Sequence, residues 1–527
     1  MIIPKPYKTE INEGGFEINN KVAINPGANI LSFNELNLFM DKAFGYTLEM
    51  ADKGAIKFVI DNGGIELKDS YNLTVDDKSI EIKAADERGI FYGVQTLKQL
   101  IAANCGNVTA LIPALKITDM PRFKHRGYML DSCRHFTPVE SIIKIIDLVA
   151  QLKLNVFHWH LTEDQGWRIQ IDSFPELTTV GARRKETLGD GKRHGGYYSK
   201  EDIRKVVEYA KSKFITVIPE IDLPGHSMAA AAAYNYLTCR GESLEVATSF
   251  GIKPDIFCAG KESTYEFLFK VLDELCEMFP DEYIHLGGDE APKVRWAECP
   301  HCNKVIKENG LKNEEQLQGY FINRLTEYLK AKGKKVICWN ESIYSKILDP
   351  DVVCQYWSDG KGAENVVREI NNGRKAIISK FTPYYLDYPF AMHPLKKVYE
   401  LNPVLSNTEK AENIIGVEAP LWTEYIKNLE RIEYLTFPRL SALAETAWTA
   451  ENNRDYSDYY LRLDGYSKLL DIYGVNYAPK KELNPCVFGK IRQMLKFVKL
   501  IYSKESVKAL KEGARAVREM KKIRKEV

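Results

Sequence analysis

The sequence predicts an α/β protein built on a (β/α)8 (TIM) barrel, preceded by a small α+β domain and followed by a helical C-terminal extension. Three observations indicate this fold. Eight short β-branched or apolar runs follow residue 120, amphipathic helical stretches separate most of them, and no Gly-rich fingerprint follows the first run. The last observation disfavours the doubly wound open sheet, which is the alternative arrangement.

Residues 1–119 are expected to form the small α+β domain. Segments 55–60, 71–77 and 79–85 are rich in β-branched residues and predict strands. Apolar residues recur at helical spacing over 87–103, which predicts a helix. We find no cluster of catalytic residue types in this part of the sequence.

The barrel is predicted over residues 120–479. Its expected strands are the runs at 126–131, 155–161, 216–223, 283–290, 335–341, 352–358, 375–380 and 414–422. Helical patterns between them include 139–153, 200–213, 264–279 and 314–332. This span exceeds the ~250 residues typical of such barrels, so long loops are expected.

Barrel enzymes carry their active residues at the C-terminal ends of the strands. Polar and aromatic residues gather at these positions here: Asp131, Arg134, Glu163, Asp164, Asp222, His226, Asp289, Glu290, 339–341, Trp357 and 422–424. Eight separate elements would not often share this property by chance. The sequence therefore predicts an active site at this end of the barrel.

The C-terminal extension, 480–527, is basic. Residues 489–527 contain thirteen Lys or Arg and four Glu, with apolar residues at helical spacing between 491 and 501. One interpretation is a helix or two packed on the body with a solvated basic face. The other is contact with an acidic partner or a membrane surface.

Overall charge and composition exclude several classes of protein. Of the 527 residues, 73 are Lys or Arg and 72 are Asp or Glu, so the formal net charge of +1 argues against a dominant nucleic-acid surface. No apolar run is long enough for a membrane span. The N-terminus lacks a secretory signal pattern and the ten cysteines are scattered, so a cytoplasmic protein with reduced thiols is expected.

The strongest chemical signal is the segment YIHLGGDEAPKVRW (283–296), where a strand leads into two glycines and the adjacent acids Asp289 and Glu290. Two close carboxylates repel each other, so one would stay protonated and could act as a general acid. Side chains of adjacent residues diverge, which fits poorly the two-carboxylate geometry of a standard retaining glycosidase. They better fit protonation of a leaving oxygen by one acid and orientation of a neighbouring 2-acetamido group by the other.

Three of the seven tryptophans, Trp339, Trp357 and Trp422, lie at or near predicted strand ends. Indole faces suit the apolar faces of sugar rings. His158 and His160, with His226 and His285, allow a different hypothesis, a metal-dependent hydrolase; buried histidines hydrogen-bonded to neighbours explain the same spacing.

Cys299 and Cys302 form one CxxC pair with no second pair at zinc-finger spacing, so a loop with free thiols, or an incidental disulfide, is the expectation there.

Five segments, in order, resemble glycoside hydrolase family 20, the β-N-acetylhexosaminidases: RGYMLDSCRHF, LNVFHWHLTEDQGWRIQI, VIPEIDLPGHS, IHLGGDE and APLWTEY. The match runs from about Arg126 to Trp448, and the N-terminal residues are similar to the small domain that often precedes this barrel. The resemblance implies an exo-acting retaining enzyme that removes terminal β-linked GlcNAc or GalNAc through an oxazolinium intermediate, without metal or organic cofactor.

The resemblance also implies roles for individual residues. Glu290 matches the general acid/base, and Asp289 matches the residue that bonds the acetamido N–H. His226 matches the histidine behind the general acid. The remaining matches are sugar-binding: Arg134 for hydroxyls, Trp339, Trp357 and Trp422 for the walls, Tyr385 for the acetamido oxygen with its neighbour Asp387, and Glu424 for a hydroxyl.

Relatives often carry Asp-Asp where this chain has Glu163–Asp164, so the extra methylene is expected to alter the partner of His226. Glu290 is expected to have a raised pKa and Asp289 to stay ionised. Release of a disaccharide, as by a lacto-N-biosidase, deacetylation of amino sugars and sugar binding without catalysis are the alternatives. A homodimer is possible, and no nucleic-acid partner is expected.

Overall fold

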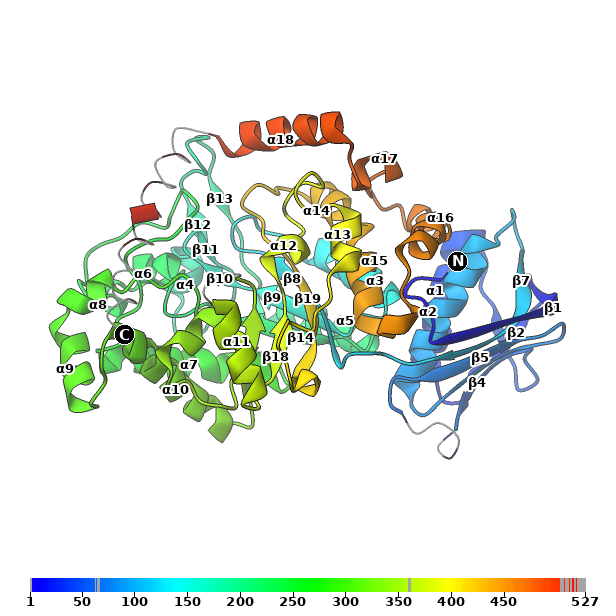
Figure 1. Ribbon diagram of the computed structural model, residues 1–527, viewed down its shortest axis with the longest axis horizontal. Helices are drawn as coiled ribbons and strands as arrows, with labels where there is room; N and C mark the ends of the chain where they lie inside the picture. Colours follow the sequence, from blue (N-terminus) through cyan, green and yellow to red (C-terminus); the bar gives the residue numbers. More distant parts are fainter. Residues whose placement is uncertain are drawn as a thin grey trace.

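The computed structural model describes residues 2–61, 63, 67–358, 362–502, 507, 511, 514–515 and 518. An N-terminal sheet with two helices lies beside a closed barrel, and a C-terminal helix crosses one edge of the barrel (Figure 1). Much of the predicted basic extension beyond residue 502 lies outside the described residues. Among the described residues, no helix combines the length and apolar character needed to cross a membrane.

The N-terminal part is a mixed seven-stranded sheet in the order β1-β7-β5-β6-β4-β2-β3. Its strands are β1 (Lys8–Ile18), β2 (Ala23–Asn25), β3 (Glu49–Met50), β4 (Ile56–Ile60), β5 (Tyr71–Val75), β6 (Ile80–Ala84) and β7 (Ala110–Asp119). Helices α1 (Ile30–Phe44) and α2 (Glu87–Ala103) complete it. The structure contains the three predicted strands and the predicted helix α2; β1, β7 and α1 were not predicted.

Helix α2 lies between the sheet and the barrel (Figure 1). Nearly all of its residues are buried. It begins at Glu87 because the Asp86 side chain accepts a hydrogen bond from the Gly89 N–H. A buried polar contact joins the two parts of the protein. The Lys153 ammonium and the Trp448 indole N–H both donate to the Asp119 carboxylate, at 2.7 and 2.8 Å. The sheet is therefore fixed against the barrel through ionic and apolar contacts.

Eight parallel strands close the barrel, as predicted. They are β8 (His125–Asp131), β9 (Val156–His160), β14 (Thr216–Glu220), β15 (Tyr283–His285), β16 (Lys335–Trp339), β17 (Val353–Tyr356), β18 (Ala376–Ile378) and β19 (Ile414–Leu421). Between them lie α3 (Val139–Gln151), α4 (Glu176–Thr179), α5 (Lys200–Ser212), α6 (Met228–Ala233), α7 (Glu262–Met278), α8 (Val294–Glu298), α9 (Pro300–Glu308), α10 (Glu314–Ala331), α11 (Gly362–Asn371), α12 (Phe381–Tyr384) and α13 (Leu395–Glu400).

Short elements fill the long loops of the barrel. Two small hairpins pair β10 (Thr162–Glu163) with β11 (Gly166–Trp167) and β12 (Arg183–Arg184) with β13 (His194–Gly195). The 3-10 helices are η1 (Asn235–Leu237), η2 (Asn340–Ser345), η3 (Ala411–Asn413) and η4 (Glu451–Asn453). The connection from β16 to β17 contains only η2, so the alternation of strand and α-helix is broken at this point.

The barrel interior is filled by layers of side chains. The lowest layer is apolar and contains Val156, Ile218, Ile337, Val353 and Ile377. The middle layer is polar and contains buried histidines around Glu220 and Glu418. The top layer contains Met129 and the aromatic residues Trp339, Tyr385 and Trp422. Side chains of alternate residues along each strand point inward, so each strand contributes to successive layers.

The predicted strand 283–290 is too long, since β15 ends at His285. Gly287, Gly288 and Glu290 have φ angles of +64°, +102° and +45°, which lie outside the β region of a regular strand. The chain therefore leaves the strand before the two acids, and Asp289 and Glu290 stand on a turn above the barrel.

Helices α14 (Leu429–Thr436), α15 (Arg439–Trp448), α16 (Tyr456–Ile472), α17 (Lys480–Leu483) and α18 (Val487–Ile501) end the described chain. Helix α18 crosses the barrel edge (Figure 1). Its Phe497 ring contacts the rings of Tyr388 and Tyr425. Its apolar residues Phe488 and Leu495 are 82% and 66% exposed. The helix therefore contacts the body on its Phe497 side, as the first interpretation expected, but most of its apolar residues do not pack there.

Candidate active site

The structure brings all eleven predicted site residues to one end of the barrel, and every strand supplies at least one. Arg134 follows β8, Glu163 follows β9, His226 follows β14, Asp289 and Glu290 follow β15, Trp339 ends β16, Trp357 follows β17, Tyr385 and Asp387 follow β18, and Trp422 and Glu424 follow β19. Carboxyl ends of parallel strands meet at one edge, so residues separated by up to 290 positions become neighbours.

The turn that carries the two acids needs glycine. A Cβ atom at Gly287 would lie 1.8 Å from the Oδ1 atom of Asp222, so no other residue fits there. The same Oδ1 atom accepts the N–H of Gly288 at 3.2 Å. His226 and Glu290 both have positive φ angles, +50° and +45°, which non-glycine residues adopt mainly where the surrounding structure holds them. Both side chains are thereby directed at each other.

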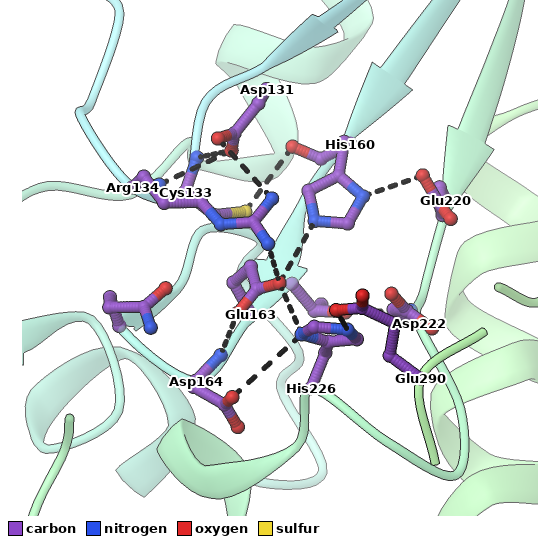
Figure 2. Close-up of polar contacts among 12 residues, drawn as sticks. Asp131, Cys133, Arg134, His160, Glu163, Asp164, Glu220, Asp222, His226 and Glu290 are labelled. Carbon is purple, nitrogen blue, oxygen red and sulfur yellow. Dashed lines mark hydrogen bonds and ion pairs between the residues drawn. The ribbon is translucent and has the colours of Figure 1, made fainter. Parts of the chain in front are cut away.

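A chain of charged contacts runs beside Glu290 (Figure 2). The Nε2 atom of His226 lies 3.7 Å from Oε2 of Glu290, and its Nδ1 atom lies 2.6 Å from Oε1 of Glu163. Glu163 also pairs with Arg134, and Asp164 approaches the Nδ1 atom of His226 only to 3.8 Å. The acid that contacts His226 is therefore Glu163, as expected from its extra methylene, since this longer side chain reaches both His226 and Arg134.

The two acids have raised pKa values. Burial, with the charge of Asp289, raises the pKa of Glu290 to about 8 although the His226 charge opposes the shift; the Glu290 side chain is 34% exposed. Burial raises the pKa of Asp289 to about 7. The raised pKa of Glu290 agrees with expectation. The raised pKa of Asp289 differs from the expectation of an ionised carboxylate, because this carboxyl is buried and faces the carboxylates of Glu341 and Glu220 in the free site.

His226 carries the compensating positive charge. Burial disfavours the charged imidazole, but Glu163 and Asp222 outweigh it and hold the pKa of His226 well above its ordinary value. Arg134 and His226 in turn hold the pKa of Glu163 at about 2 despite its burial. The site therefore contains a charged His226–Glu163 pair next to a protonated Glu290.

Aromatic rings surround these acids. The Trp339 and Trp422 ring centroids are 6.0 Å apart, and Trp357 and Tyr385 stack at 6.1 Å with an angle of 27°. The Arg134 guanidinium lies 4.7 Å from the Trp422 ring centroid. Such faces bind the apolar side of a sugar ring.

Several polar atoms in this enclosure have no hydrogen-bond partner among the described residues. They are Oδ1 of Asp289, Nε1 of Trp357, Oδ1 of Asp387 and Nε of Arg134. Buried polar atoms without partners are uncommon in folded proteins and mark places where a ligand completes the bonding. Asp387 and Glu424 both have raised pKa values, caused first by burial. The mouth of the barrel is therefore shaped for a polar ligand with an apolar face.

Two buried acids were not identified from the sequence. Glu220 accepts the indole N–H of Trp339 at 2.7 Å and contacts His160 at 2.5 Å and His285 at 3.1 Å. Glu418 lies 2.8 Å from Nδ1 of His158. Glutamates at inward-facing positions of TVIPE and IIGVEAPL were the signal that could have revealed them. The histidines of the HxH pattern are thus held by carboxylates, which supports their interpretation as buried, hydrogen-bonded residues.

Comparison with known proteins identifies the family. Residues 123–451 match the family described as glycosyl hydrolase family 20, catalytic domain, and residues 1–120 match its domain 2. The chain belongs to glycosyl hydrolase family 20. This membership explains why the five sequence motifs occur in one order along the barrel.

Named relatives of this family 20 chain support the same family assignment. A β-hexosaminidase of Porphyromonas gingivalis is 38% identical over 503 residues, which is 90% of this chain and 64% of that longer relative. Among solved structures, an exo β-N-acetylglucosaminidase of Vibrio harveyi in complex with N-acetylglucosamine has a TM-score of 0.83 at 31% identity, covering 91% of this chain and 78% of the other. A β-N-acetylhexosaminidase of Bacteroides fragilis has a TM-score of 0.80 at 34% identity, covering 91% and 97%.

Proposed function

We propose that this family 20 protein is an exo-acting, retaining β-N-acetylhexosaminidase. It removes terminal β-linked GlcNAc or GalNAc by substrate-assisted catalysis through an oxazolinium intermediate. The observation that carries the proposal is the protonated Glu290 beside His226, with the unpartnered Oδ1 atom of Asp289 next to it, inside an aromatic enclosure. The names of the relatives support the same activity.

In the first step, Glu290 donates its proton to the glycosidic oxygen. The carbonyl oxygen of the substrate's own acetamido group attacks the anomeric carbon, and the bond to the leaving group breaks. Asp289 accepts the acetamido N–H and balances the positive charge of the oxazolinium ring. That charge lowers the pKa of Asp289 from about 7, so the carboxyl becomes fully ionised when it is needed.

In the second step, the Glu290 carboxylate removes a proton from water, and the water oxygen attacks the anomeric carbon. The oxazolinium ring opens, the acetamido group is restored and the β configuration is retained. The His226 cation stabilises the Glu290 carboxylate between the two steps, because its Nε2 atom lies 3.7 Å away. Glu163 keeps His226 charged and oriented.

The remaining residues bind the sugar. Trp339, Trp357 and Trp422 wall the ring and the acetamido methyl, and Tyr385 donates to the acetamido oxygen. Arg134, Asp387 and Glu424 bind hydroxyl groups of the terminal sugar, as expected for an exo mode of action. Enclosure by the side chains of Trp339, Trp357, Tyr385 and Trp422 supports release of a single sugar over release of a disaccharide.

The proposal is tested with matched aryl β-glycosides that differ only in the 2-acetamido group. Hydrolysis of the acetamido substrate alone, and inhibition by a thiazoline that mimics the oxazolinium ring, are the expected results. Equal rates on both substrates would refute substrate assistance. Proton NMR of the first-formed sugar tests retention, since the β anomer must appear before mutarotation.

We further propose a cytoplasmic location for the enzyme, and this is supported by cysteine usage. None of the ten cysteines forms a disulfide, and the eight in the barrel region are at least partly buried, as expected in a reducing compartment. Cell fractionation with an antibody against the chain tests this; recovery in the medium or on the cell surface would contradict it.

A further inference from the structure

Four cysteines from separate parts of the sequence converge on one point beside the active-site loops. Cys239 and Cys258 belong to the long connection between α6 and α7, and Cys299 and Cys302 stand at the start of α9. Their sulfur atoms all lie within 4.8 Å of one another. The sequence offered only the CxxC pair at 299–302, because its partners are 41 or more residues away.

The distances between these sulfurs match a tetrahedral metal site. The Sγ–Sγ separations are 3.9 Å for Cys239–Cys302, 3.8 Å for Cys258–Cys299 and 3.6 Å for Cys258–Cys302. Four sulfurs at ~2.3 Å from a central zinc stand about 3.8 Å apart. A disulfide requires about 2.05 Å, so these pairs are not bonded to one another.

The cluster is largely buried and lies at the start of a helix. Cys258, Cys299 and Cys302 are buried, and Cys239 is partly exposed. Cys299 is the residue just before α9 and Cys302 lies in its first turn, where the free N–H groups and the helix dipole stabilise negative charge. The cysteine pair therefore lies in a helix start and not in the loop expected from the sequence.

A close backbone approach brings the two segments together. A Cβ atom on Gly260 would lie 2.2 Å from the carbonyl carbon of His301, so only glycine allows this approach.

We propose that Cys239, Cys258, Cys299 and Cys302 bind one structural zinc ion. Zinc replaces the thiol protons, which pass to solvent, and no oxidation or reduction takes place. Four protein ligands leave no open position, so the ion is not a catalyst. Tetrahedral sulfur sites also suit iron, but a redox-inactive ion fits a protein whose proposed reaction transfers no electrons.

The ion fastens two loops that carry active-site residues. The loop after β14 carries His226, Cys239 and Cys258, while the segment after β15 carries Asp289 and Glu290 and reaches Cys299. Two further contacts join these loops: the Trp296 indole donates to the Phe257 carbonyl at 2.9 Å, and Arg295 pairs with Asp255 at 3.0 Å. The zinc site is thus a positioning element for the His226–Glu290 contact.

The test measures metal in the full chain, purified without a metal-binding tag and under reducing conditions. We expect plasma mass spectrometry to find one zinc ion per chain. A mercurial reagent that blocks the thiols should release this zinc, which a zinc-binding dye then detects. Cys239→Ser and Cys302→Ser should each lose the zinc. Cys276→Ser, which removes a partly exposed cysteine of α7 outside the cluster, should keep it.

Zinc-free wild-type protein after incubation with zinc chloride would overturn the proposal, and so would iron in place of zinc. Disulfides among these four cysteines, seen by intact mass under non-reducing conditions, would also overturn it. The zinc content of the wild-type protein tests the proposal even if a variant does not fold. A zinc-free Cys239→Ser variant should have a Tm lower by about 5 °C or more; an unchanged Tm would exclude the fastening role. These readouts do not depend on hydrolytic activity, so they stand apart from the proposed function.

Discussion

His226 stands between two carboxyl groups, and its Nε2 atom is 3.7 Å from the Oε2 atom of Glu290. The opposite ring nitrogen is held by Glu163 at 2.6 Å. Because Glu163 keeps the imidazole charged, the Glu290 carboxyl has a cation beside it in both of its protonation states. Burial raises the pKa of Glu290, and this cation limits the rise to about 8. Glu290 can thus give up its proton and recover it near neutral pH.

Replacing Glu290 by Gln removes the proton donor and leaves the shape of the site. We expect kcat to fall by about 10²–10⁴ on a β-N-acetylglucosaminide with a poor leaving group. An activated aryl leaving group needs less protonation, so the loss on it should be smaller. Steady-state rates on both substrates check this, with Glu282→Gln at the opposite end of the barrel as the control. Equal losses on the two substrates would contradict a role as general acid.

Replacing Asp289 by Asn removes the charge that balances the oxazolinium ring. We expect a loss of about 10²–10³ in kcat, comparable to the removal of one transition-state hydrogen bond in a buried site. Binding of a thiazoline inhibitor should weaken by a similar factor, measured by competition. Undiminished inhibitor binding would show that Asp289 does not contact the acetamido group.

The pH dependence of kcat/KM should be bell-shaped. Activity requires ionised Asp289, so it should fall as the pH drops below about 7; it also requires protonated Glu290, so it should fall above about 8. Since the two acids are adjacent, the acidic and alkaline limbs of the profile report pKa values of the pair and not of either acid alone. Initial rates between pH 5 and 10, at substrate concentrations far below KM, are the measurement. Full activity at pH 10 would be incompatible with the assignment.

Glu163→Gln tests the contact with His226. Without the Glu163 charge the pKa of His226 falls, the neutral imidazole no longer favours the Glu290 carboxylate, and the pKa of Glu290 rises. The alkaline limb of kcat/KM should therefore move to higher pH, with a loss of about tenfold or more in rate from poorer orientation. Glu245→Gln, on the surface beside Lys185, is the matched control. An alkaline limb that stays in place would contradict this coupling.

The buried polar layer makes stability depend on pH. Burial opposes the charge of His158, but Glu418 and Glu220 raise its pKa to about 9, above the value of about 6.5 in an unfolded chain. The stabilisation is complete below pH 6.5 and is lost as the pH rises through 9, on the order of 3 kcal/mol. Tm measured from pH 6.5 to 9.5 should fall, and Glu418→Gln should flatten this slope. A rising Tm would be inconsistent with a charged His158.

Much of the barrel could be predicted from the sequence. The runs RGYMLD and NVFHWHL became β8 and β9 within one or two residues, because buried parallel strands are apolar on both faces. The prediction was less accurate where glycines with positive φ angles end a strand, since β15 stops at His285, before Gly287 and Gly288. Helix α1 was missed because its apolar residues are mixed with exposed leucines such as Leu38.

The active site also combines features that the sequence predicted with features that it did not. Asp289, Glu290 and the tryptophans were identified from local motifs, since each motif lies on one short segment. The change of partner at Glu163 depended on how far a side chain reaches, and the ionisation of Asp289 depended on acids from other strands. Neither can be read from neighbours in the sequence.

The sequence alone determined the strand order, the position of the paired acids and the family 20 motifs, because periodicity and local residue patterns are written along the chain. The tertiary structure decided which charges face one another: His226 with Glu163, Glu220 with three histidines, and Cys239 and Cys258 with Cys299 and Cys302. These contacts join residues far apart in sequence, and their energies depend on distances and burial that arise only when the barrel closes.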